Sequence, residues 1–538
     1  MINTIYIFFI FFALTILGHF LYSIWKTKKC LHILQLNSYY NSRYLTWLIK
    51  KRSSLLQPRD LEPLIALAGL FFFNRPLIVL IFTATIYGKL LLEIPKIAEK
   101  KPLVFTARAS RLFITNTIFL LILYGYLLHF MTTNGGLLFG LSLGSLVIYN
   151  ILQPLLLMAA NWLLMPLEWI IQKMYLKSGA AYIKSLETLK VIGITGSFGK
   201  TTTKHIVTEL LKRRFNTLKT PQSYNTLMGI TKTIRTDLKP IHEFFVVEMS
   251  AKQPGDIKQI CDLVKPQYGM ITAIGEQHLE TFKTLDTIKK TKNELIESLS
   301  SSGIAFFNVD DPLCRELATM AQCRVITYSM DSSAADYRAT NIVIDETGSK
   351  FTVLKQGAET PIRFATSLLG KHHIYNILGA IAIASELGIK LDDMVYPIRQ
   401  LAAVPHRLAI KKTSDDIVII DDAFNSNPVG SSMALEVLAQ FNSRRKIIFT
   451  PGMVELGTKE EQHNHEFGEH IAKICDYVIL VGKRQTLPIQ RALIEKNYPQ
   501  SRLFIAQDFL TARQHLEEIL QPSDVVLFEN DLPDNYNE

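Results

Sequence analysis

The sequence predicts two consecutive α/β domains, the second of them Rossmann-like, preceded by transmembrane α-helices. Three observations support this fold class. Uncharged segments long enough to cross a bilayer occur only within the first 160 residues. From residue 186 onward, short β-rich runs alternate with helical stretches, which is typical of α/β sheets. Between the two patterns, a glycine-rich turn at residues 193–203 follows an apolar strand and opens a helix.

The N-terminal region contains three clear candidate spans. Residues 5–25 are uncharged and are followed by Lys26, Lys28 and Lys29, whereas no basic residue precedes them. Because a signal peptide has the opposite polarity, this segment is predicted to be an anchor. Residues 112–131 and 136–160 are two further spans joined by a short uncharged turn, and basic residues flank the pair on both outer sides. Their outer ends are therefore expected in the cytoplasm.

Residues 64–92 leave the number of spans open at three or four. The stretch is apolar, but Asn74-Arg75-Pro76 and Lys89 interrupt it, and basic segments lie on both sides. A single span would place one basic segment outside and leave Arg75 near the middle of the membrane. A shallow hairpin turning at Arg75-Pro76 agrees better with the charge rule.

Charge separates the membrane region from the rest of the chain. Residues 1–185 carry 18 Lys and Arg against 5 Asp and Glu, a net charge of +13, whereas the whole chain is +10. Residues 186–538 therefore carry −3, so no basic surface for nucleic acid is predicted there, and the N-terminal charges suit lipid headgroups. The five cysteines form no C-x-x-C pair, which argues against a zinc ribbon and agrees with a reducing compartment.

The pattern along the chain predicts three parts: a membrane region (1–185), a central domain (186–404), which is an ATPase candidate because it carries the glycine-rich turn, and a C-terminal domain (405–538). Candidate strands of the central domain are residues 191–195, 244–249, 268–274, 304–309 and 325–328, with an antiparallel hairpin appendage between about 336 and 366 and a helix near 373–387. Candidate strands of the C-terminal domain are residues 417–420, 446–449, 477–481, 503–506 and 525–528.

The glycine-rich turn predicts a nucleoside triphosphate site. Gly196 and Gly199 allow backbone N–H groups to surround phosphate oxygens, Lys200 can reach the β- and γ-phosphates, and the Thr201 hydroxyl can ligate Mg²⁺. Since Ile194 stands where the strict P-loop pattern has glycine, the match is to the shorter string T-G-S-x-G-K-T. The alternative, an ordinary strand-to-helix turn, is weak for the whole string.

Two polar residues follow neighbouring strands of the same predicted sheet. Glu248 ends the run Phe-Phe-Val-Val-Glu, and His278 follows Met-Ile-Thr-Ala-Ile-Gly-Glu-Gln. Alone, Glu248 is as consistent with a helix cap or a surface carboxylate as with a ligand, and a lone His278 is more often a structural histidine. Beside a P-loop, the pair favours a second cation site, because open α/β sheets bind ligands at the carboxyl ends of their strands.

Residues from about 190 to 530 resemble the Mur ligase family of ATP-dependent, amide-forming ligases, most closely the type that adds D-alanyl-D-alanine to peptidoglycan precursors. The resemblance depends on ordered motifs, which are residues 193–202, 223–225, 248–257, 271–280, 292–294, 308–311, 370–376, 421–428 and 453–457.

The resemblance implies a role for each matching residue. The nucleotide would contact residues of both domains: Thr195, Gly196, Ser197, Gly199, Lys200, Thr201, Thr202, Asn376, Arg407 and Asp421. Magnesium would be held by Thr201, Glu248, His278 and Lys292, the last as a carbamate; Lys200, Lys292, His278 and Glu248 would form the catalytic set. Substrates would contact Ser223, Asn225, Asn425, Asn427 and Glu455.

The implied chemistry uses ATP and Mg²⁺ to convert a carboxylate into an acyl phosphate, which an amine then attacks. Four departures from the family pattern put the acceptor in doubt. Membrane segments replace the domain that binds the uridine nucleotide, and His373 replaces an asparagine. Thr450-Pro451-Gly452 replaces Leu-Gly-Asp, and residues 528–534 lack a Lys-Gly-Ser-Arg-like stretch.

Three functional hypotheses follow. The first is a ligase anchored in the cytoplasmic membrane, with its catalytic domains in the cytoplasm, that acts on a UDP-sugar peptide. The second is a ligase for a lipid-linked or polymeric acceptor. The third is a non-catalytic, nucleotide-binding scaffold, which has no need for Lys200, Glu248, His278 and Lys292 together.

Overall fold

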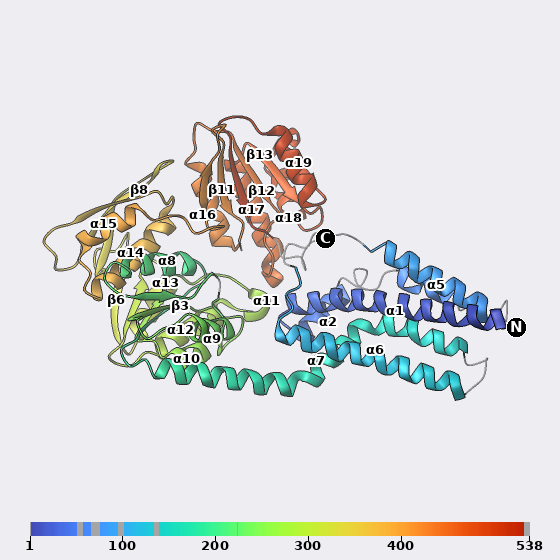
Figure 1. Cartoon of the computed structure of the whole chain (residues 1–538). Coiled ribbons are helices and arrows are strands. Elements are labelled where there is room, and N and C mark those ends of the chain that lie inside the picture. Colours follow the sequence, from blue (N-terminus) through green and yellow to red (C-terminus); the bar gives the residue numbers. More distant parts are fainter. Residues whose placement is uncertain are drawn as a thin grey trace. The chain divides into compact units, whose positions relative to one another are not determined.

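The computed structural model describes residues 2–50, 58–65, 76–94, 102–133, 139–222, 224–424 and 426–531. The chain forms two compact units, one reaching to Gln172 and one starting at Lys173. Both units are drawn in Figure 1. The change from one unit to the other falls inside a single helix, twelve to thirteen residues before the sequence-based boundary at 185.

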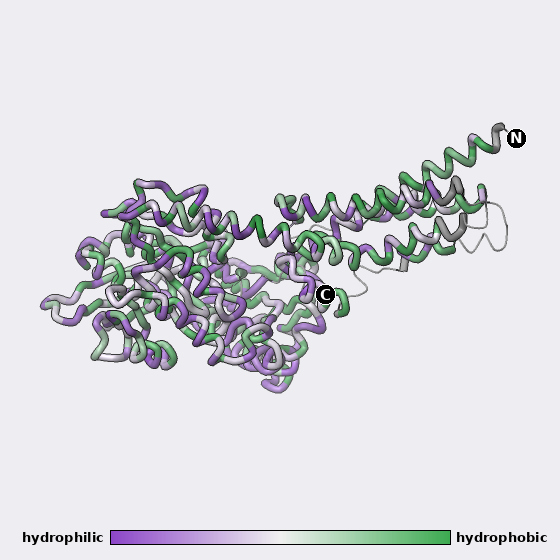
Figure 2. The backbone as a smooth tube through the Cα atoms, turned by 90° about the horizontal axis from the view of Figure 1, so that it is seen from below, coloured by the Kyte–Doolittle hydropathy of each residue, from purple (hydrophilic) through white to green (hydrophobic). Residues whose placement is uncertain are grey.

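The N-terminal unit is helical. Its elements are α1 (Ile2–Leu36), α2 (Asn41–Lys50), the 3₁₀ turn η1 (Pro58–Leu61), α5 (Pro76–Leu92), α6 (Ala107–Thr133) and α7 (Phe139–Lys184). Hydrophobic residues dominate the long helices of this unit in Figure 2. In the unit that starts at Lys173, hydrophobic and hydrophilic residues are mixed. Segments of α1, α6 and α7 are long and apolar enough to cross a membrane, and α5 is shorter.

The structure leaves part of the span prediction open. The helix α5 begins at Pro76, but Asn74, Arg75 and residues 66–73 lie outside the described residues, so the proposed hairpin at Arg75-Pro76 stays a prediction. The turn expected between α6 and α7 also lies largely outside them. The helix α7 extends well past the predicted end of its span at residue 160 and contains Pro154 and Pro166.

The first domain of the second unit is a nine-stranded sheet in the order β2-β3-β1-β4-β5-β6-β7-β8-β9. The strands are β1 (Lys190–Thr195), β2 (Thr217–Lys219), β3 (Phe244–Glu248), β4 (Tyr268–Ile271), β5 (Ile304–Asn308), β6 (Arg324–Ser329), β7 (Tyr337–Asp345), β8 (Gly348–Lys355) and β9 (Ile362–Thr366). The first six are parallel. The expected hairpin is a three-stranded antiparallel extension of this sheet and not a separate appendage, because β7 pairs with β6.

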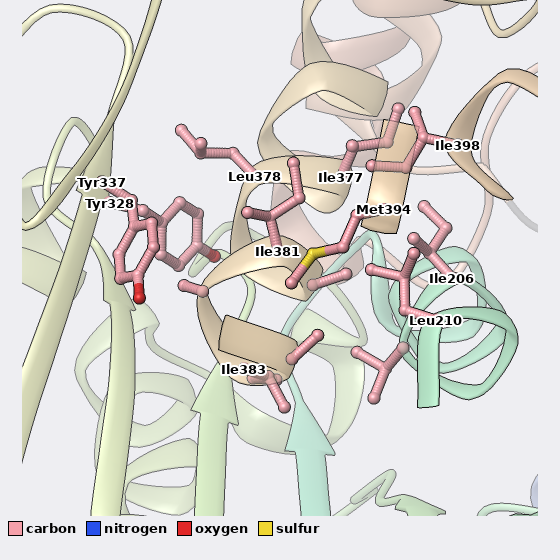
Figure 3. Packing of buried hydrophobic residues seen from close by; sticks show 14 of the residues in the cluster. Ile206, Leu210, Tyr328, Tyr337, Ile377, Leu378, Ile381, Ile383, Met394 and Ile398 are labelled. Atoms are coloured by element: carbon pink, nitrogen blue, oxygen red, sulfur yellow. The ribbon is translucent and has the colours of Figure 1, made fainter. Parts of the chain in front are cut away.

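Helices cover both faces of this sheet (Figure 1). They are α8 (Lys200–Leu211), α9 (Leu227–Thr236), α10 (Asp256–Val264), α11 (Leu279–Phe282), α12 (Leu285–Glu297), α13 (Pro312–Met320), α14 (Lys371–Glu386) and α15 (Leu391–Arg399). Figure 3 shows the core on one face, where aliphatic side chains of α8, α14 and α15 meet and two tyrosines project from the strands. This packing fixes the start of α8, where the glycine-rich turn ends.

The C-terminal domain is a six-stranded sheet in the order β10-β11-β15-β12-β13-β14. Its strands are β10 (Ala409–Lys412), β11 (Val418–Asp422), β12 (Lys446–Thr450), β13 (Tyr477–Val481), β14 (Leu503–Ala506) and β15 (Val525–Glu529). Its helices are α16 (Pro428–Ala439), α17 (Glu460–Ile474), α18 (Leu487–Glu495) and α19 (Phe509–Ile519), with short 3₁₀ turns at Gly457–Lys459 and Gln500–Arg502. Only the edge strand β10 is antiparallel, so the sheet has the Rossmann-like character that the sequence predicted.

The last turns of α7 belong to this second unit and pack on its sheet helices. Gly179 contacts Thr231 of α9 so closely that a Cβ atom at Gly179 would lie 2.9 Å from the Thr231 methyl. The Arg235 guanidinium stacks over the Tyr175 ring at 4.2 Å, and the Tyr182 hydroxyl donates to the Leu238 carbonyl at 3.0 Å. The helix that begins in the apolar region therefore ends as part of the α/β unit.

Candidate nucleotide and metal site

The glycine-rich turn lies between β1, a central strand of the sheet, and the N-terminus of α8. Gly196 and Gly199 have φ angles of 150° and 81°, which side chains disfavour. A Cβ atom at Gly196 would lie 2.0 Å from Thr272 Oγ1, and one at Gly199 would lie 2.5 Å from Asn376 Oδ1. Both glycines are thus required by the backbone path and by the residues that enclose it.

Lys200 folds back over this turn. Its Nζ donates to the carbonyl oxygens of Gly196 at 2.6 Å and Ser197 at 3.1 Å. Burial and the nearby Arg407 lower the pKa of Lys200 to about 8, although Glu248 opposes the shift. A lysine in this position can bind a phosphate group, whose negative charge would stabilise its charged form.

Glu248 is a buried carboxylate of the site and is 1% exposed. Its Oε1 accepts hydrogen bonds from Thr201 Oγ1 at 3.1 Å and Asn225 Nδ2 at 2.9 Å, and its Oε2 lies 2.8 Å from Lys204 Nζ. Burial alone would raise the pKa of Glu248, but Lys204 and the hydrogen bond from Asn225 lower it below its usual value. The carboxylate is therefore held ionised, with an oxygen beside the Thr201 hydroxyl.

Two hard oxygen ligands, Glu248 Oε1 and Thr201 Oγ1, lie close enough to coordinate one cation. Mg²⁺ prefers such ligands and completes its shell with phosphate oxygens and water. These two oxygens therefore fit one magnesium ion, although the sequence assigned Thr201 to a first ion and Glu248, with His278, to a second.

Lys292 lies on α12 and is 2% exposed, although its helix pattern resembles that of a surface lysine. No hydrogen bond or ion pair joins its amine to another of the residues that the structure describes. Burial, with a smaller contribution from repulsion by Lys200, lowers the pKa of Lys292 to about 7. Glu294 and Asp256 oppose this shift because they attract the charged amine. A buried, largely uncharged amine is the form that reacts with CO₂ to give a carbamate.

His278 connects the two α/β domains. Its backbone is left-handed (φ 52°), and its Nδ1 lies 2.5 Å from Glu455 Oε2 of the C-terminal domain. Nearby, Glu276 pairs with Lys459 at 2.5 Å and His463 at 2.6 Å. The predicted metal ligand His278 and the predicted substrate residue Glu455 thus contact each other directly in this structure.

A cavity of about 530 Å³ opens between the glycine-rich turn and the C-terminal domain. Among the sequence-predicted residues, its lining includes Gly199, Thr202, Asn376, Arg407 and Asn427. Asn376 Oδ1 accepts from Thr203 Oγ1 at 3.2 Å, and the Arg407 guanidinium stacks on Phe424 at 4.2 Å.

Asp422, which sequence reasoning did not select, lines this cavity beside Arg407. Burial raises the pKa of Asp422 to about 6, although Arg407 opposes the shift. Its neighbour Asp421, which the sequence selected, pairs instead with His406 at 3.0 Å and lies outside the lining. Both aspartates end β11, and a strand's alternation alone does not tell which of two terminal carboxylates faces a ligand.

His372 and His373 also line the cavity. His373 is 2% exposed, and neither of its ring nitrogens has a hydrogen-bond partner among the described residues. Burial lowers the pKa of His372 to about 4 and that of His373 well below its usual value, so both rings are neutral at physiological pH. In the sequence, this part of the site is indicated only by His373, which replaces an asparagine of the family pattern.

The remaining predicted residues fall into two groups. Thr195 and Ser197 support the turn, since Thr195 Oγ1 donates to the Met249 carbonyl at 2.9 Å and Ser197 Oγ donates to the Gly275 carbonyl at 2.8 Å. Ser223 and Asn425 lie outside the described residues, so their predicted contacts with substrate are untested.

Family models agree with this geometry. The Mur ligase middle domain matches residues 194–384, and the Mur ligase glutamate ligase domain matches residues 406–529. The first 193 residues lie outside both matches. The chain is 30% identical over 310 residues to UDP-N-acetylmuramoyl-tripeptide–D-alanyl-D-alanine ligase of Escherichia coli, covering 57% of this chain and 67% of the relative. It is 30% identical over 351 residues to the same ligase of Bacillus subtilis, covering 65% and 74%.

Solved structures give the same result. MurF of Acinetobacter baumannii superposes with a TM-score of 0.60 at 26% identity, covering 67% of this chain and 78% of that one. MurF of Thermotoga maritima in complex with ADP superposes with a TM-score of 0.59 at 25% identity, covering 67% and 80%. The family matches over both α/β domains define the chain as an ATP-dependent, ADP-forming ligase. The chain belongs to the Mur ligase family, and its relatives are of the MurF type.

Proposed function

We propose that this chain is a membrane-anchored ligase of the MurF type that joins a peptide carboxylate to an amine such as D-alanyl-D-alanine in peptidoglycan precursor synthesis. The observation that carries the proposal is the arrangement of Lys200, Thr201, Glu248 and Lys292 at one end of the sheet, beside a cavity completed by Arg407. The named relatives act on UDP-N-acetylmuramoyl-tripeptide and D-alanyl-D-alanine.

The reaction has two steps. A carboxylate oxygen of the acceptor attacks the γ-phosphorus of ATP, the bond to the bridging oxygen breaks, and ADP leaves. The amine nitrogen then attacks the acyl carbon, loses a proton, and inorganic phosphate leaves. Lys200 is positioned to stabilise the charge on the transferred group, and the C-terminal domain excludes water from the acyl phosphate.

Mg²⁺ would be held by Thr201 and Glu248, with His278 and carbamylated Lys292 as further ligands by family resemblance. When bound, it lowers the repulsion between the acceptor carboxylate and the phosphates. The buried amine of Lys292 supports carbamylation because its lowered pKa supplies the neutral nucleophile.

The membrane anchor would consist of the apolar helices in α1, α6 and α7. Basic residues at 26–29, 100–111 and 173–184 would lie on the cytoplasmic side and contact anionic lipids. An acceptor carried on a lipid is a specific second candidate, because the helical region occupies the part of the chain that precedes the matched domains.

The test is phosphate release by the full-length protein in detergent or nanodiscs with ATP, Mg²⁺ and D-alanyl-D-alanine. One arm supplies UDP-N-acetylmuramoyl-tripeptide, and the other supplies the same peptide on a lipid-linked precursor. Release in the first arm supports the soluble acceptor, and release in the second arm alone supports the lipid-linked one. Nucleotide binding without phosphate release in any arm would favour the scaffold hypothesis and contradict the proposal.

A further inference from the structure

A second buried lysine, Lys204, lies on α8 one turn after Lys200 and has no part in the P-loop pattern. It is 2% exposed. Its Nζ lies 2.8 Å from Glu248 Oε2 and donates to the Gln222 carbonyl at 2.6 Å. Lys204 therefore neutralises Glu248, the carboxylate assigned above to the metal ion.

A buried ion pair of this kind is weak evidence for stability, because the cost of removing two charges from water is about as large as their attraction. Apolar side chains of similar size would fill the same space at less cost. The position of Lys204, on the carboxylate beside Thr201, suggests that the charge itself matters.

The surroundings of Glu248 carry an excess of positive charge. Lys200 and Arg407 interact electrostatically with the same carboxylate, in addition to Lys204. Across the part of the chain that the structure describes, no group of three or more His, Cys, Asp or Glu side chains could hold a metal ion. A divalent cation entering without nucleotide would meet the Glu248 carboxylate, the carbamate proposed at Lys292 and three cationic side chains, so positive charge would still be in excess.

We propose that Lys204 is a positioning residue that excludes divalent cations from the site until a nucleotide supplies negative charge. The inference depends on the proposed function, since it assigns Glu248 and Thr201 to the metal. A triphosphate brings several negative oxygens, which outweigh Lys204 and complete the oxygen shell that Mg²⁺ prefers. Metal and nucleotide would thus bind together and not one after the other.

The same contacts orient the carboxylate. Lys204 holds Oε2 and is itself fixed by the Gln222 carbonyl, so Oε1 remains turned toward Thr201 and Asn225. Gln222 precedes the segment that carries Asn225. Lys204 therefore joins the metal carboxylate to the loop expected to contact substrate.

The test measures Mn²⁺ uptake by electron paramagnetic resonance on the full chain in detergent, with and without ADP. The wild-type protein should take up Mn²⁺ only with ADP. Without nucleotide, Lys204→Met should bind Mn²⁺ at least about tenfold more tightly than the wild type does. The reason is that Lys204 and the ion would lie on opposite sides of the Glu248 carboxylate, where repulsion between a unit charge and a divalent ion is appreciable even in water. Lys204→Arg, which retains the charge, should behave as the wild type.

Lys212→Met is the matched control, because Lys212 follows the same helix but is exposed and pairs with Glu209 at 3.1 Å. It should leave Mn²⁺ uptake unchanged. If Lys204→Met fails to fold by circular dichroism, Lys204→Gln takes its place, since its amide can still donate to the Gln222 carbonyl. Tight Mn²⁺ binding by nucleotide-free wild type, or no gain in a folded neutral variant, would overturn the inference. If the wild-type protein does not bind ADP at all, that result would instead contradict the proposed function.

Discussion

Lys292 offers the sharpest prediction, because its amine must be uncharged before it can form a carbamate. At pH 7.5 an amine with a pKa of about 7 is about three-quarters unprotonated, whereas one with the ordinary value of 10.5 is about 0.1% unprotonated. The buried position therefore increases the reactive form by roughly two to three orders of magnitude. The amine nitrogen attacks the carbon of CO₂ and loses one proton, which leaves a negatively charged carbamate.

The assay is ¹³C NMR of the full-length protein in detergent with ¹³C-bicarbonate. A carbamate carbonyl signal should be present at pH 8 and should be lost as the pH falls through about 7, because protonation of Lys292 removes the nucleophile. Lys292→Ala should lack the signal and lose at least about 100-fold in turnover, since the carbamate that would help to hold Mg²⁺ at the phosphates disappears. Added formate or bicarbonate should restore part of the rate. Lys290→Ala, at an exposed position of the same helix, is the matched control. Full activity of Lys292→Ala, together with no carbamate signal in the wild type, would refute the reasoning.

Three further predictions concern the site and the apolar helices that precede it. Lys200→Ala should abolish turnover while the protein still inserts into membranes, since the change removes a phosphate contact and no apolar span; near-normal phosphate release would contradict the P-loop assignment. Gly179→Ala should lower the melting temperature of the ligase unit, because overpacking against Thr231 costs about 1–3 kcal/mol and the gain in helix propensity is about 1 kcal/mol. Thr231→Ser removes the clashing methyl and should restore stability in the double variant, and a purely additive loss would show that the contact is not the cause. In a background without native cysteines, an impermeant thiol reagent should label Thr133→Cys but not Ser185→Cys in intact cells, and external labelling at 185 would contradict a cytoplasmic ligase.

The local parts of the fold could be predicted from the sequence. Glycine-rich turns and buried parallel strands have strong local signals, so β1, the turn after it and Glu248 at the end of β3 were found where the structure has them. The strands β2 and β10 were missed because they are three- and four-residue edge strands. The extension β7–β9 was expected as an appendage, since its pairing to β6 depends on a long-range contact that the alternating pattern does not reveal.

The candidate site was only partly predictable, for a different reason. Burial of a charged side chain is a property of tertiary packing, which the local sequence does not reveal. Lys292 therefore resembled a surface lysine and Lys204 was not selected, although both are 2% exposed. The choice of Asp421 over Asp422 depended on which of two adjacent carboxylates turns toward the cavity, and β11 alone does not determine that direction. The continuation of α7 into the α/β unit was missed because its last turns pack against α9.

The central claim is that the acceptor carboxylate is activated as an acyl phosphate at the P-loop. The most direct measurement uses the acceptor with ¹⁸O in its reacting carboxylate, ATP, Mg²⁺ and D-alanyl-D-alanine, and analyses the released phosphate by mass spectrometry. Since one carboxylate oxygen stays on phosphorus when the amine displaces phosphate, the account predicts one ¹⁸O in each phosphate released by the wild type and no release by Lys200→Ala. Product formation with unlabelled phosphate would contradict it.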